Sequence, residues 1–169
     1  MALREIVTVP NPVLRRKAHP VTKFDGELQV LITDMIETMR EAPGVGLAAP
    51  QVGVSQRVIL VEYTTDEEDE TAPKKLFVVV NPEIKVTDKE TEMGVEGCLS
   101  VPGLLGDVER PLAVTVKGLN RQGQPTRIKA QGWLARIFLH EVDHLEGVVF
   151  TDLAETIWKP EQDDYVDNV

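Results

Sequence analysis

Apolar residues recur at helical spacing between residues 27 and 42. They occupy positions i, i+3, i+4, i+7 and i+11 of that segment: Leu28, Leu31, Ile32, Met35 and Met39. This stripe predicts an amphipathic helix that packs one face against a core. Pro43 and Gly44 follow the stripe and end the helix.

Short β-branched runs, each bounded by Gly, Pro, Asn or charged residues, predict antiparallel strands elsewhere in the chain. The runs cover residues 57–62, 76–81, 112–117 and 126–130. Between the last two runs, Gly123 supplies the glycine that a short hairpin loop requires. Helical spacing returns over residues 132–146, which predicts a second amphipathic helix.

The composition is that of a soluble globular domain: 169 residues, of which 42% are hydrophobic and 27% charged. The chain has no internal repeat and no Gly/Ser linker, so we expect one domain over residues 1–169. From about residue 160 the chain is acidic and poor in apolar residues, and we expect a loosely ordered tail there. A single cysteine cannot form an intramolecular disulfide, which fits a reducing compartment.

Charge and hydropathy exclude several classes of function. Lys and Arg total 18 against 28 Asp and Glu, so the surface repels phosphate backbones and anionic lipids, and we expect no direct nucleic-acid binding. No apolar run approaches the roughly 20 residues that cross a bilayer, and the N-terminus lacks the apolar core of a secretory signal. We therefore expect a cytoplasmic protein that does not enter membranes.

Five consecutive acidic residues occupy positions 66–70. Neighbouring side chains of an extended run point in opposite directions and converge poorly on one ion. We therefore interpret this run as a solvated loop tip rather than as a metal site.

The segment 140–144 reads His-Glu-Val-Asp-His and lies within the second predicted helix. On a helix, His140 and His144 share one face, so both imidazoles can reach one metal ion while Glu141 lies close to a bound water. The alternative is that these are ordinary polar residues of an amphipathic helix. A catalytic centre of this type keeps three protein ligands and one open position, so a third ligand is needed.

Cys98 is the candidate for that third ligand, since it is the one cysteine of the chain and follows Gly97 in a turn. It could instead be an inert buried thiol, or a nucleophile with a histidine as its base. Both alternatives fit less well beside the spacing of His140 and His144. The segment 44–51 is rich in glycine and ends in Gln51; it is either a wall for an extended peptide backbone or simply a helix C-cap and loop.

Three segments together resemble the peptide deformylases: G-V-G-L-A-A-P-Q at 44–51, E-G-C-L-S at 96–100 and H-E-V-D-H-L-E-G at 140–147. Their order and spacing match the family, and the likeness extends over nearly the whole chain. The resemblance implies an α+β fold in which antiparallel β-strands pack around a central HExxH motif helix. It also implies hydrolysis of the N-formyl group of formylmethionyl polypeptides, with release of formate.

The resemblance further implies a role for each matching residue. Metal ligands would be Cys98, His140 and His144, with a metal-activated water as nucleophile and Glu141 as general acid/base. Gln51 and the backbone N–H of Leu99 would face the developing oxyanion. The usual metal of the family is Fe(II), with Zn, Ni or Co able to occupy the site. A thiolate and Fe(II) together invite oxidation, so activity should be lost in air.

For the substrate, the resemblance suggests two groups of contacts. A pocket for the methionine side chain would be lined by Val45, Leu105, Trp133 and Ile137. Gly46 and Gly97 would lie where a peptide backbone can pair with them. Arg136 falls near the same wall, where it must either extend its charge outward or serve another purpose.

Departures from the family pattern affect details of this interpretation. Leu139 stands where many members have Gln, and the acidic run at 66–70 reads as an insertion. Some members dock on the ribosome through a basic C-terminal helix, whereas this chain ends in an acidic tail, so any ribosome contact would be transient. We expect a monomer.

Two other functions remain open on the sequence. A zincin-type peptidase would use the same motif with a downstream ligand such as Glu146, although that residue lies on a different face of the helix from the histidines. A non-enzymatic metal module would need a closed site of four ligands, and we can find only three.

Overall fold

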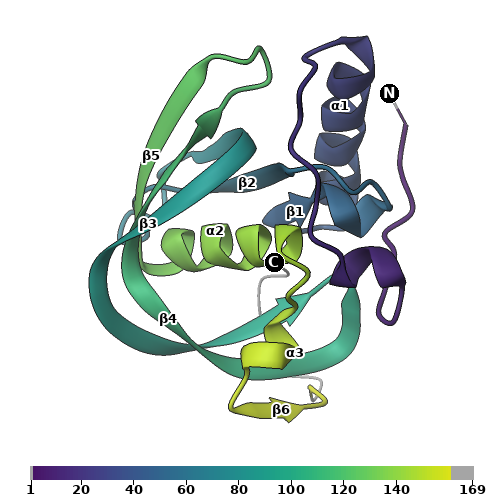
Figure 1. Cartoon of the computed structure of the whole chain (residues 1–169). Helices are drawn as coiled ribbons and strands as arrows, with labels where there is room; N and C mark the ends of the chain where they lie inside the picture. Colours follow the sequence, from purple (N-terminus) through teal and green to yellow (C-terminus); the bar gives the residue numbers. More distant parts are fainter. Residues whose placement is uncertain (1, 161–169) are drawn as a thin grey trace.

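The structure is a computed structural model that describes residues 2–160. Within that range an antiparallel sheet has the strand order β1-β2-β3-β4-β5, with β6 paired to β4 (Figure 1). The strands are β1 (Gly46–Ala48), β2 (Val58–Thr64), β3 (Lys74–Cys98), β4 (Val101–Leu119), β5 (Pro125–Gln131) and β6 (Thr156–Trp158). The helices are α1 (Gly26–Glu41), α2 (Gly132–Leu145) and α3 (Phe150–Leu153), with 3-10 turns η1 (Pro12–Arg15) and η2 (Ala49–Val52). The α+β class and the antiparallel pairing are therefore as predicted.

Both predicted helices are confirmed. Asp25 caps α1 by accepting a hydrogen bond from the Leu28 backbone N–H at 3.0 Å, and the helix ends directly before the predicted stop at Pro43. The second helix, α2, has its predicted position and carries the His-Glu-x-x-His motif. The loop between β4 and β5 is the predicted hairpin, with Gly123 at φ +83°.

The sheet separates the two long helices. Alternate residues of β2 point to opposite faces, so Val58 and Leu60 pack in the cluster that contains the apolar stripe of α1. Ile59 and Val61 pack in the cluster that contains the apolar face of α2. This two-sided burial explains why the run is continuously apolar rather than alternating.

Strands β3 and β4 are much longer than the sequence predicted. They curve around α2 (Figure 1) and pair along most of their length, with register shifts at four places. At their far end β3 stops at Cys98, and a two-residue turn leads into β4 at Val101. This extension brings Cys98, the last residue of β3, to the C-terminal half of α2.

Side chains from distant segments hold both ends of α2. At its start the Trp133 backbone N–H donates to Glu67 Oε1 at 2.8 Å. At its end Arg57 donates to the Leu145 carbonyl at 3.2 Å and to Glu146 Oε1 at 2.7 Å. The residues 66–70 are exposed, as predicted for a loop tip, but one of them caps the motif helix.

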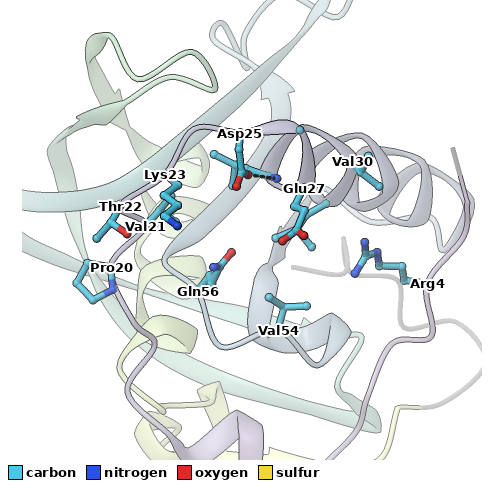
Figure 2. Close-up of a pocket in the computed structure, with 13 residues that line it drawn as sticks. Arg4, Pro20, Val21, Thr22, Lys23, Asp25, Glu27, Val30, Val54 and Gln56 are labelled. Carbon is cyan, nitrogen blue, oxygen red and sulfur yellow. Dashed lines mark hydrogen bonds between the residues drawn. The ribbon is translucent and has the colours of Figure 1, made fainter.

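Two surface cavities are lined by residues other than the predicted site residues. One, of about 770 Å³, lies beside the first turn of α1, where Figure 2 shows Arg4, Lys23 and Glu27 around it. The other, of about 1040 Å³, lies between the acidic loop and strands β4 and β5. Among the described residues, none of the helices is both long and apolar enough to cross a bilayer. Residues 161–169 of the predicted tail lie outside the described residues.

Candidate functional site

Three buried side chains bring their ligand atoms together at the centre of the molecule. Cys98 comes from the end of β3, and His140 and His144 come from one face of α2. The Nε2 atoms of the two histidines are 3.2 Å apart, and Cys98 Sγ lies 3.4 Å from His144 Nε2. All three ligand atoms lie within 4.8 Å of one another, so the three predicted metal ligands form one cluster.

The chemistry of this cluster suits a divalent metal. Burial raises the pKa of the Cys98 thiol, and the charge of Glu141 raises it further. Burial also lowers the pKa of His144 well below its usual value, so its imidazole is neutral and able to ligate. A thiol in such surroundings ionises when a cation binds it, and a thiolate with two imidazoles is a donor set for iron, zinc, cobalt or nickel rather than for magnesium or calcium. The residues therefore fit a metal of the group that the resemblance implies, without distinguishing among its members.

Glu141 lies beside this cluster on α2. Its side chain is fully buried, and neither carboxylate oxygen has a hydrogen-bond partner within residues 2–160. Burial, reinforced by the charge of Glu96, raises the pKa of Glu141 well above its usual value. A Cβ on Gly46 would lie 2.3 Å from Glu141 Oε2, so the glycine leaves the space that the carboxylate fills. An unpaired buried carboxylate in this position is suited to accept and return a proton.

Gln51 is held with its amide NH2 towards the cluster. Its Oε1 accepts a hydrogen bond from the Ala48 backbone N–H at 3.0 Å, which fixes the orientation of the amide. Its Nε2 donates to Ser100 Oγ at 3.1 Å and lies 3.6 Å from Cys98 Sγ. Leu99 is in the turn between β3 and β4, next to the cysteine. Of the two predicted oxyanion donors, Gln51 therefore lies next to the ligand cluster in the fold, and Leu99 is next to Cys98 in the chain.

Sequence reasoning missed the carboxylate that holds His140. Glu96 Oε1 lies 2.9 Å from His140 Nδ1, so this contact turns the Nε2 of the ring towards the cluster. Arg110 donates to both oxygens of Glu96 at 2.9 Å and to Asp143 at 2.6 Å. Burial raises the pKa of Glu96, but the hydrogen bonds from Arg110 and His140 outweigh it and hold that pKa below its usual value. The signal was present, because Glu96 begins the E-G-C-L-S segment.

The predicted substrate residues fall into two places. Val45 and Ile137 are buried in the core cluster around α2, and Trp133 packs against it. The second place is the paired part of β3 and β4, where Gly97 is opposite Leu105.

Arg136 does not extend its charge outward. Its side chain is 5% exposed and its guanidinium is bound inside the protein, so the first of the two predicted alternatives is wrong. Leu139, the departure from the family pattern, packs against the core cluster.

The alternative third ligand of a zincin-type site is engaged elsewhere. Glu146 pairs with Arg57 at 2.7 Å and with Lys17 at 3.6 Å at the end of α2. In the part of the chain that the structure describes, the one group of three or more potential metal ligands is the cluster of Cys98 and the two histidines. Three ligands leave an open position, which favours a catalytic over a structural site.

Comparisons with known proteins agree with this geometry. The family model described as polypeptide deformylase matches residues 3–159. A peptide deformylase of Natranaerobius thermophilus is 49% identical over 162 residues, which cover 96% of this chain and 99% of the relative. The solved peptide deformylase of Thermotoga maritima superposes with a TM-score of 0.81 at 43% identity, covering 91% of this chain and 99% of the other. A structure from Synechococcus elongatus in complex with actinonin has a TM-score of 0.80 at 41% identity, covering 90% of this chain and 79% of the other.

Proposed function

This chain belongs to the polypeptide deformylase family, whose members remove N-formyl groups from newly made polypeptides, and we propose that it does so with a metal ion held by Cys98, His140 and His144. The observation that carries this proposal is the convergence of those three ligand atoms within 4.8 Å of one another. The unpaired carboxylate of Glu141 beside them supports hydrolysis rather than a structural role.

When bound at this site, a divalent metal would lower the pKa of a water molecule towards about 7 and so supply a nucleophile near neutral pH. We propose Fe(II) as the ion used in the cell, with Zn, Ni or Co able to take its place. The thiolate and imidazole donors support this group of metals without distinguishing among its members.

The chain's own residues transfer the proton and bind the oxyanion. Glu141 takes the proton of the attacking water and returns it to the amine that leaves when the formyl C–N bond breaks, because within residues 2–160 no hydrogen-bond partner occupies its carboxylate. Gln51 Nε2 and the Leu99 N–H donate to the oxygen of the formyl group as negative charge develops there. One such donor contributes about 3 kcal/mol of transition-state stabilisation.

We propose that the substrate's methionine side chain lies near Val45, Leu105, Trp133 and Ile137, and that its backbone pairs along Gly46 and Gly97. Backbone pairing gives affinity that does not depend on the residues after the first. We also propose that the enzyme is monomeric and cytoplasmic, and that it contacts the ribosome only transiently.

The test is formate release from a short formyl-methionyl peptide by protein loaded anaerobically with Fe(II), beside the acetylated peptide. Rapid release from the formyl peptide alone is expected. Cys98→Ala should lose both metal and activity, whereas Glu141→Gln, which keeps the size of the side chain, should keep the metal and lose activity. Full activity of Glu141→Gln would contradict the proposed proton transfer, and stoichiometric tight metal binding by Cys98→Ala would contradict the ligand set.

A further inference from the structure

Arg136 occupies a socket built from β3, β4 and α2. Its Nη1 donates to Glu96 Oε2 at 2.7 Å and to the Val108 carbonyl at 2.8 Å, and its Nη2 donates to the Glu92 carbonyl at 2.8 Å. Its guanidinium carbon lies 5.5 Å from the centre of the Trp133 ring. A guanidinium bound on so many sides has one orientation.

The strand backbone is shaped to admit this guanidinium. A Cβ on Gly94 would lie 2.6 Å from Arg136 Cζ and 2.8 Å from its Nε, so a side chain at that position would displace the charged group. Gly94 does not require a left-handed backbone, which means that the close approach of Arg136 explains the glycine. The two residues form a matched pair across β3 and α2.

The bound guanidinium completes the hydrogen bonding of Glu96. Glu96 Oε2 accepts one bond from Arg110 and one from Arg136, and its Oε1 accepts a second bond from Arg110 and contacts His140 Nδ1. A carboxylate has about four acceptor positions, so in this arrangement all are used. Glu96 therefore has no free lone pair with which to turn towards another donor or towards a metal.

We propose that Arg136 is a positioning residue for the metal ligand His140, acting through Glu96. It binds Glu96 Oε2 and thereby holds Oε1 against His140 Nδ1. The inference rests on the proposed function, because it assumes that His140 ligates the metal through Nε2.

Arg110 alone does not provide this constraint. One of its branches is bound to Asp143, whose side chain is 28% exposed, so part of its anchorage lies at the surface. Arg136 is anchored to carbonyls of both long strands and lies one helical turn before His140, on the same face of α2. A single carboxylate of β3 thus contacts two side chains of α2 at i and i+4, which fixes the rotation of the helix relative to the strand.

The experiment compares Arg136→Met with Gly94→Ala, which keeps the arginine but fills its socket. Three readouts are the rate of zinc loss to an excess of chelator, the visible spectrum of the cobalt-loaded protein, and the exchange of the His140 Nδ1–H signal in zinc-loaded, 15N-labelled protein. Changes in residues behind a metal ligand typically weaken metal binding about 10- to 100-fold. We expect zinc loss to accelerate by such a factor in both variants, with an altered cobalt spectrum and faster exchange.

The control is Arg121→Met, because Arg121 makes three comparable hydrogen bonds to α1 far from the site. It should leave the metal readouts unchanged even where it lowers stability. The double variant Gly94→Ala/Arg136→Met should lose zinc no faster than Arg136→Met alone, since both changes remove the same contact.

The outcomes separate the two levels of the proposal. Wild-type rates of zinc loss and an unchanged Nδ1–H signal in folded Gly94→Ala and Arg136→Met would overturn the positioning role and leave the proposed function intact. A wild-type protein in which His140 shows no metal-dependent shift would instead overturn the ligand set. Gly94→Ala keeps the test decisive if Arg136→Met fails to fold.

Discussion

Gly46→Ala is the substitution that most directly probes the position of the Glu141 carboxylate. The new methyl carbon would lie 2.3 Å from Glu141 Oε2, whereas ordinary contacts begin at 3.4 Å. The carboxylate must therefore retreat by about 1 Å, a displacement large enough to matter in catalysis. Because Gly46 lies in a strand without a positive φ, the backbone itself accepts alanine.

The expected loss follows from what Glu141 does. General acid–base catalysis contributes about 10²- to 10⁴-fold, and a misplacement of about 1 Å can cost about 100-fold. We expect kcat/KM for formate release to fall about 100-fold while the metal content stays at one ion. Overpacking of this kind should destabilise the fold by about 1 to 3 kcal/mol, measured by urea unfolding.

The matched control is Gly26→Ala, because the same methyl group at Gly26 meets nothing within 4 Å. It should leave the rate unchanged and alter stability by at most about 1 kcal/mol. A folded, metal-loaded Gly46→Ala protein whose rate stays within about twofold of wild type would refute the reasoning, since Glu141 would then not act from its observed position.

Three further predictions concern stability, pH and the metal. Glu67→Ala removes the acceptor of the Trp133 N–H and should cost about 1 kcal/mol in urea unfolding, whereas the neighbouring Glu68→Ala should cost little. The hydrogen bond from Arg40 lowers the pKa of Glu62 in the folded state, so the stability that this pair contributes is present above the ordinary value of 4.5 and is lost as pH falls through the folded pKa. The free energy of unfolding of Glu62→Gln in urea should therefore lie about a few tenths of a kcal/mol below that of wild type at pH 7, and the difference should disappear as the pH falls below the folded pKa of Glu62. Fe(II)-loaded enzyme should lose activity in air while the Ni(II)-loaded enzyme keeps it, and equal survival of the two would contradict oxidation at the site.

The elements that the sequence predicted are those whose signals are local. The stripe of α1 and its stop at Pro43 lie within one segment, and the same is true of Gly123 in the β4–β5 hairpin. The motif of α2 also lies within a single helix, so its two imidazoles could be placed on one face from spacing alone.

The long strands were not predictable in this way. Beyond Pro82 the alternation of apolar and polar positions in β3 extends only to Val86, because residues 87–92 are all polar and register shifts follow Val86 and Asp88. Its conformation depends on pairing with β4, which lies later in the chain. The residues that hold His140 share this difficulty, since Glu96 meets Arg110 and Arg136 only once β3, β4 and α2 are assembled.

Most of the buried charges around α2 balance one another. Glu96 and Asp143 are matched by two guanidinium groups, so that part of the network is neutral. The groups left over are the carboxylate of Glu141 and the thiol of Cys98, both fully buried and both with pKa values raised by burial. Leaving two anions uncompensated there would cost several kcal/mol each. A divalent cation balances the two charges, and the neighbouring network adds no net charge of its own. A metal ion held by Cys98, His140 and His144 would in turn favour the ionised form of Glu141, which is able to accept a proton.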